Sequence, residues 1–358
     1  MTTMTALVVP APSHEDANLR PLPWRRMVWV TWRQHRSALI GVASLFVVLT
    51  MCFWIAGLHL HHAYAAAIAC RPASSLACHE QVNSFDGMYG FLANGFLLQA
   101  VPALIGAFIG APVLARELES GTCRFAWTQG FGRWRWTLAK VVMLGVVVSA
   151  AAAAISVLFS WYYQPYFPAT NQALYVSKEL PIGASSPFAP GLFDLRGVSF
   201  AAWTLAGFAI GVFAGVLIRR VVPAIVATLA AYIALAFAVD GFIRQHYLAP
   251  LVTSKLSIAD SAWIISQQWY TRSGRPASQS VLTQVLSEGP PGQVRGKGGV
   301  PKSVDVWHYL AQHGYTQLTT YQPASRFWPF QWIEGGWLLA LSALLVAVTV
   351  WRVRRRAV

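Results

Sequence analysis

The chain has 358 residues, of which 56% are hydrophobic and 11% are charged, and its mean hydropathy is +0.47. Because an ordinary soluble domain has about 25% charged residues, this composition excludes a soluble globule, a disordered chain and a coiled coil. The net charge of +14 raises the question of nucleic-acid binding. However, the basic residues flank long apolar segments and form no patch of their own, so no nucleic-acid partner is expected.

Six apolar segments are long enough to cross the ~30 Å hydrocarbon layer of a bilayer, which takes about 20 residues in a helix. Each is expected to be helical, because lipid leaves free backbone N–H and C=O groups unsatisfied. The predicted fold class is an all-α integral membrane protein with six transmembrane helices. The expected spans are residues 38–60, 91–114, 141–161, 198–217, 223–242 and 332–351, so that residues 37–242 hold the first five.

The segment before the first span has two parts. Residues 1–23 are mixed and contain proline, which predicts a flexible cytoplasmic N-terminus. Residues 24–36 place tryptophans and other apolar residues on one side of a helix and arginines on the other, which favours an amphipathic interfacial helix. A plain basic flank that anchors the first span explains the same pattern equally well.

The first outer loop contains Cys70 and Cys78, and oxidising conditions outside the cell permit a disulfide between them. His59, His61, His62 and His79 lie near this loop and could bind zinc with the cysteines, but the spacing matches no metal signature. We therefore expect no metal site.

Two spans carry glycines at helical spacing. Gly106 and Gly110 form one G-x-x-x-G in the second span, and Gly207, Gly211 and Gly215 form a double one in the fourth. This spacing permits close approach between helices. Packing within the chain is the default interpretation, and dimerisation is the alternative.

Residues 115–140 form the one long inner loop, ARELESGTCRFAWTQGFGRWRWTLAK. A helix with Glu117 and Glu119 that ends in a turn at Gly121 would give a rigid polar knob for a cytoplasmic protein to move. The alternative is a solvated basic loop at the lipid surface.

The largest outer segment, residues 243–331, is long enough for a small extracellular domain. Residues 257–270, 280–288 and 304–314 are expected to be helical, and the Gly- and Pro-rich residues 287–303 are expected to form a mobile loop. The aromatic residues of this region suit an apolar gate lining, although an ordinary core and interfacial belt is favoured. A basic cytoplasmic tail, residues 352–358, follows the last span.

Titratable residues near the spans lie toward the outer ends. Asp240, Arg244, Trp332 and Glu334 are candidates for an outer gate, in which the two carboxylates could pair with basic groups, although wetted helix ends are the simpler interpretation. The middle of the spans has no carboxylate or histidine, which disfavours an ion-coupled carrier.

Orientation follows from the basic residues, because positive loops stay in the cytoplasm. More than half of the 27 Lys and Arg residues would lie on one side, which also contains both termini. The sequence has no phosphate-binding loop, because Lys297 in GQVRGKGG is followed by glycine and not by Ser or Thr. It also has no recognised catalytic motif. We therefore expect neither a bound cofactor nor an enzymatic activity in this chain.

The inner loop resembles that of permease subunits of bacterial ATP-binding-cassette exporters with six spans. The resemblance extends to YQPASRFWPFQWIEGG, residues 321–336, which is similar to the entrance of the last span in actinobacterial permeases, but Gly130 stands where the family often has proline. In the inner loop the residues that match are Glu117, Glu119, Gly121, Thr122, Thr128, Arg133 and Lys140, and Arg124 adds charge to the contact surface.

The resemblance implies a permease in the cell membrane that pairs with a separate cytoplasmic ATPase, which would hold the ATP and magnesium. It also implies a second permease copy or paralogue, an inner loop that couples ATP hydrolysis to the spans, and export of a substrate. The aromatic outer residues favour a hydrophobic or amphipathic substrate, but the sequence does not identify it. A membrane sensor or assembly factor with a ligand-binding ectodomain is the alternative from another class.

Overall fold

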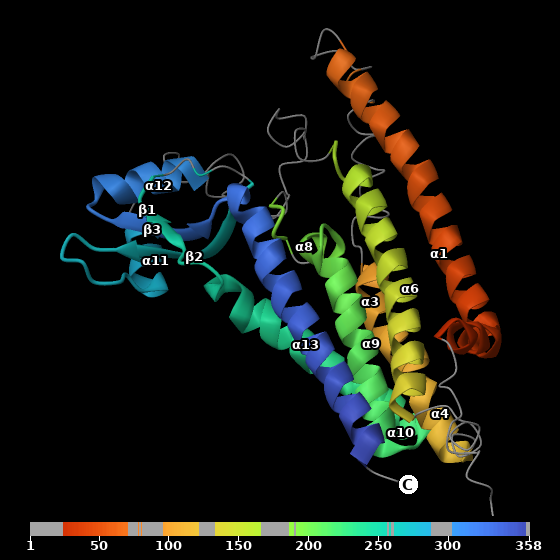
Figure 1. Cartoon of the computed structure of the whole chain (residues 1–358). Coiled ribbons are helices and arrows are strands. Elements are labelled where there is room, and N and C mark those ends of the chain that lie inside the picture. The colour runs from red at the N-terminus through yellow and green to blue at the C-terminus, as the bar shows by residue number, and fades with distance from the viewer. Residues whose placement is uncertain are drawn as a thin grey trace, which may run out of the picture.

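The computed structural model describes residues 24–70, 78, 80, 96–121, 133–165, 186–189, 191–255, 258, 261–287 and 303–355. The fold is mostly helical, and the predicted fold class is confirmed, with a small three-stranded sheet between the fifth and sixth spans (Figure 1). Among these residues, six helical segments are long and apolar enough to cross a membrane: Phe46–Ala69, Leu98–Ser120, Trp134–Tyr162, Ser199–Ile218, Val221–His246 and Ala324–Arg355.

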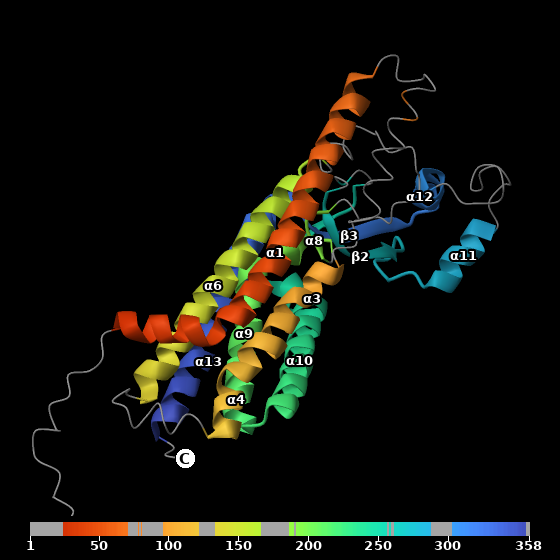
Figure 2. The same cartoon turned by 90° about the vertical axis from the view of Figure 1, so that its right-hand side faces the viewer.

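The first helix, α1 (Trp24–Ala69), is longer than expected and joins residues 24–36 to the first span. Its N-terminal turns run across the direction of the rest of the helix (Figure 2). The apolar stretch after His61 and His62 continues the helix, so the candidate span is Phe46–Ala69 and lies further toward the outer side than predicted. His59, His61 and His62 therefore lie in the helix that precedes the first outer loop. The membrane-surface position of residues 24–36 stays a prediction.

Helix α9 (Ser199–Ile218) is apolar on all sides, which is the pattern of a helix that is buried all round. It lies in the middle of the bundle (Figure 1) and contacts α6 (Arg133–Tyr162), α10 (Val221–Ala238) and α13 (Phe327–Arg355). Helix α1 packs against α6 at the edge of the bundle. The position of every span therefore depends, directly or through α6, on α9.

The second span is made of three pieces, α3 (Phe96–Ile105), the π-helix η2 (Gly106–Gly110) and α4 (Ala111–Ser120). All five glycines of the predicted motifs lie where this span meets α9. A Cβ on Gly211 would come within 2.1 Å of the Gly106 carbonyl oxygen, and a Cβ on Gly106 within 2.3 Å of the Gly207 carbonyl oxygen. The glycines thus serve packing within the chain.

The sheet has the order β1-β3-β2 and is antiparallel throughout, with β1 Leu251–Thr253, β2 Trp263–Tyr270 and β3 Thr316–Gln322. The expected helix over residues 257–270 is wrong, because its isoleucines and aromatic residues favour a strand once β3 is available to pair with it. The other two expected helices are confirmed as α11 (Gln279–Ser287) and α12 (Ser303–Gln312). Most of the predicted mobile loop lies outside the described residues.

The two ends of the bundle differ in charge. The end at which α4 and α13 finish and α6 and α10 begin lies opposite the sheet (Figure 1). This end collects Arg116, Arg135, Lys140, Arg219, Arg220, Arg352, Arg354 and Arg355. The arrangement is the one that the positive-inside pattern predicts. We call it the inner end and the opposite one the outer end.

At the outer end Cys70 and Cys78 form a disulfide. Short elements surround the neighbouring span ends, and Phe188, Phe193, Phe327 and Phe330 form a buried aromatic cluster there. The aromatic residues of the last span's entrance therefore divide into a core pair and the exposed Trp328 and Trp332. The short elements are α8 (Leu192–Leu195), the π-helix η3 (Val239–Ile243) and the 3-10 helices η4 (Arg244–His246) and η5 (Ala324–Arg326).

Candidate functional site

A cluster of ion pairs centred on Arg244 lies at the outer end of the bundle. The Arg244 guanidinium donates from Nε to Glu334 Oε2 at 2.9 Å and from Nη2 to Glu334 Oε1 at 3.0 Å. Its Nη1 donates to Asp240 Oδ1 at 2.6 Å, and its Nη2 also pairs with Asp194. Arg244 is 2% exposed and Glu334 is fully buried. This bidentate pair joins the end of the fifth span to the sixth.

The remaining acceptor sites of Glu334 are also used. Trp203 Nε1 donates to Oε1 at 2.8 Å, and the Tyr247 hydroxyl donates to Oε2 at 3.2 Å. Trp337 Nε1 donates in turn to the Tyr247 hydroxyl at 2.9 Å. A carboxylate without water is tolerated when its charge and its lone pairs are both satisfied, and Glu334 meets this requirement.

The position of Asp194 depends on Gln331 in α13. Gln331 Oε1 accepts a hydrogen bond from the Ser199 N–H at 2.9 Å, and its Nε2 donates to the Phe193 carbonyl at 2.8 Å. These two bonds fix α8 against the start of α9. Asp194 therefore reaches Arg244 from a short helix outside the spans.

Part of this cluster was predicted from the sequence. Asp240, Arg244 and Glu334 come together as the gate interpretation predicted, and the wetted-end interpretation is wrong for Glu334. Trp332 is 63% exposed, so most of its side chain lies on the surface of the bundle. Sequence reasoning missed Asp194, although a lone acidic residue in the apolar stretch GLFDL was a usable signal. Their role as a gate stays a prediction.

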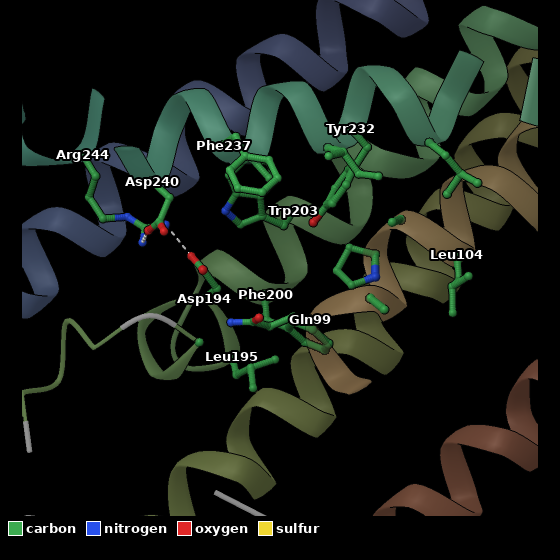
Figure 3. Close-up of a pocket in the computed structure, with 17 residues that line it drawn as sticks. Gln99, Leu104, Asp194, Leu195, Phe200, Trp203, Tyr232, Phe237, Asp240 and Arg244 are labelled. Carbon is green, nitrogen blue, oxygen red and sulfur yellow. Dashed lines mark hydrogen bonds and ion pairs between the residues drawn. The ribbon is translucent and has the colours of Figure 1, made fainter. Parts of the chain in front are cut away.

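A cavity of about 510 Å³ adjoins the cluster between α3, α9 and α10. Asp194, Asp240 and Arg244 line one end of it, and the rest is mostly apolar and aromatic (Figure 3). Nothing in the sequence pattern alone predicted it, because its walls come from three spans.

At the inner end Glu117 pairs with Lys140, whose side chain is fully buried. The Lys140 ammonium also lies 4.1 Å from the centre of the Trp136 ring. This pair joins α4 to α6. Glu119 Oε2 accepts a hydrogen bond from the backbone N–H of Val221 at 3.0 Å, and so places a negative charge at the N-terminus of α10. Glu117 and Glu119 thus join the inner ends of three spans.

These contacts change the interpretation of the inner loop. Glu117 is directed at α6 and is 19% exposed, so it offers little surface to a partner. Gly121 has φ +71 in the left-handed region and ends α4, as the predicted turn requires. Arg133 begins α6. Thr122 and Arg124 lie outside the described residues, and the docking role of the loop stays a prediction.

Residues 43–244 match the family described as ABC-2 membrane transporter related. The chain belongs to this family. The match covers more than half of the chain and includes both inner contacts and Arg244. No curated protein and no solved structure gives a significant match. The ABC-2 membrane transporter-related region therefore ends at Arg244, and the sheet and the span with Glu334 lie beyond it.

In this ABC-2-related chain, the described residues contain no group of three His, Cys, Asp or Glu side chains arranged to hold a metal ion. The ion pairs described above form two sites, one at each end of the bundle.

The stability of the outer cluster is expected to depend on pH. Burial raises the pKa of the Asp194 carboxyl to about 6; Arg244 opposes this shift, and the charges of Glu334 and Asp240 add to it. A raised pKa means that the folded protein binds the proton more tightly than the unfolded chain does. The stabilisation of the fold that comes from protonated Asp194 is therefore fully present below about pH 4, and it is lost as the pH rises through 6.

We expect the protein to be more stable at pH 5 than at pH 7.5, by about 1 kcal/mol from this group. Asp194→Asn should remove that part of the difference, as measured by thermal unfolding of the purified protein at both values. Glu80→Gln, at an exposed position away from the cluster, should retain it. An unchanged pH dependence in Asp194→Asn would assign the effect to another group.

Proposed function

We propose that the chain is the permease subunit of an ABC exporter in a bacterial cell membrane, with both termini in the cytoplasm. A separate ATPase subunit would bind ATP and magnesium, and a second permease copy or paralogue would complete the translocation path. The family, the six candidate spans and the basic inner end support this proposal.

The observation that carries the mechanism is the pair of contacts made by Glu117 and Glu119. They connect the inner ends of α4, α6 and α10 beside the point where the loop leaves α4 at Gly121. A force applied to the loop by an ATPase would therefore reach three spans together. Helix α9 packs against all three, so their displacement would in turn be passed on to α9.

The first test is purification of the tagged protein from its own host in mild detergent. We expect a stoichiometric partner with a Walker-A motif and vanadate-sensitive ATP hydrolysis. A lone protein without ATPase activity, from a host whose adjacent genes encode no such partner, would support the sensor or assembly-factor alternative.

The second test concerns the contact between α4 and α6. The double variant Glu117→Gln/Lys140→Met removes the ion pair without leaving a buried unpaired charge, which alone would cost about 3–5 kcal/mol. We expect it to bind the ATPase but to lose at least half of the movement that vanadate trapping causes at α6. Spin labels at position 134 on the two permease copies would measure this movement, in a background with Cys52→Ser and Cys123→Ser.

Labels at position 116 on α4 provide the matched control, because α4 is next to the loop and should still move. The charge-swapped variant Glu117→Lys/Lys140→Glu should recover movement at position 134. Full movement at position 134 in the uncharged double variant would contradict the coupling role of this pair.

A further inference from the structure

The cavity beside the outer cluster has the size of a ligand site. Its volume of about 510 Å³ falls within the range of about 300–1,000 Å³ that is common for small-molecule pockets. Leu104 of α3 and Ile233 and Phe237 of α10 lie on its rim and are 45%, 48% and 73% exposed. The cavity is therefore open at the side of the bundle, between α3 and α10.

One end of the cavity has more negative than positive charge. Arg244 is the only Lys, Arg or His among the described residues that line it, and three carboxylates surround that guanidinium. Glu334 is buried behind Arg244 and accepts hydrogen bonds from both its Nε and its Nη2. Asp194 and Asp240, 27% and 49% exposed, each bind Arg244 through Oδ1 only.

The second carboxylate oxygens of Asp194 and Asp240 make no hydrogen bond to other described residues. Figure 3 shows both side chains at the same end of the cavity, beside Arg244. Because Arg244 already contacts three carboxylates, it has little capacity left for an anion. Positive charge from a ligand would balance this end.

The walls next to the carboxylates are aromatic. Phe200, Trp203, Tyr232 and Phe237 line the cavity, and the rings of Trp203 and Tyr232 meet edge to face at 5.5 Å (Figure 3). Aromatic faces attract cations, and most strongly where water is excluded. The far end, with Leu104, Leu229 and Ile233, offers only apolar contact.

We propose that this cavity binds an organic cation with an apolar body. The cationic group would lie against Asp194 and Asp240, and the apolar body would lie between α3 and α10. An acyl chain alone would fill the apolar end but would leave the second oxygens of both carboxylates without a partner, and an anion would face net negative charge. Calling this cation the exported substrate rests on the function proposed above; its binding does not.

Tetraphenylphosphonium and tetraphenylborate test the proposal, because they have similar size and shape but opposite charge. We expect the purified full-length protein to bind the cation at least about tenfold more tightly than the anion, measured by equilibrium dialysis. Asp194→Asn/Asp240→Asn should weaken cation binding by about tenfold or more. In this variant Arg244 keeps its bidentate pair with Glu334, so the fold should persist.

A pair of alanine variants separates this cavity from other surfaces. Ala236→Phe would fill the cavity, whereas Ala234→Phe lies on an exposed part of α10 that does not line it. We expect only Ala236→Phe to reduce cation binding. Equal binding of the two ions, or unchanged cation binding in the double Asn variant, would overturn the proposal and indicate an apolar groove for lipid or for a second copy.

Failure of the transport proposal would have a different outcome. Cation binding that depends on Asp194 and Asp240 in a protein that recruits no ATPase would keep the site and reject the exporter. An ATPase-coupled protein whose cavity does not distinguish the two ions would keep the exporter proposal and reject the cation site.

Discussion

Arg244→Met is expected to destabilise the protein by about 3–5 kcal/mol, because it leaves the Glu334 carboxylate buried without a counter-charge. The hydrogen bonds from Trp203 and Tyr247 would remain, but neither donor is charged. The loss should be visible as a lower melting temperature and a smaller monodisperse peak on size-exclusion chromatography in detergent. Arg220→Met, at an exposed position in the turn before α10, should leave both unchanged.

The double variant Arg244→Met/Glu334→Gln distinguishes a charge effect from lost packing. It should be more stable than Arg244→Met, because no charge is left fully buried and the amide can still accept from Trp203. Asp194 and Asp240 would lose their partner, but both have exposed surface in the cavity. If the double variant is as unstable as the single one, packing of the arginine stem accounts for the effect.

Gly211→Leu is expected to destabilise the bundle by about 3 kcal/mol or more, because the new side chain would collide with backbone and not with a movable side chain. Its Cβ alone would lie 2.1 Å from the Gly106 carbonyl oxygen and 2.8 Å from the Ala111 nitrogen. Separating α9 from the second span would also disturb the π-helix η2. Thermal unfolding and the yield of monodisperse protein would measure the effect.

Gly336→Leu is the matched control, because it is also a span glycine but has nothing within 4 Å of the position of a Cβ. It should be tolerated, since leucine favours helix over glycine by roughly 0.5–1 kcal/mol. A folded, stable Gly211→Leu protein that has only lost self-association would instead support the dimerisation interpretation of the glycine motif.

The membrane architecture could be predicted from the sequence because its causes are local. Twenty apolar residues in a row must be helical in lipid, whatever they pack against, and the fourth and fifth spans begin and end within a few residues of expectation. The predicted first span, residues 38–60, lies too near the N-terminus, because the helix continues to Ala69 and its most apolar part is Phe46–Ala69. The strand β2 was missed because its preference depends on pairing with β3, about 50 residues later.

The sequence by itself determined the number of spans, the basic inner end and the spacing of the glycines, because hydropathy, charge and helical period are properties of neighbouring residues. Only the tertiary structure decided what the titratable residues do. Glu334 pairs with Arg244, 90 positions away in the sequence, and Glu119 binds the N-terminus of α10, 102 positions away. Whether a carboxylate is a wetted helix end or a buried ion-pair partner depends on which helix packs beside it, and that choice is made by the whole bundle.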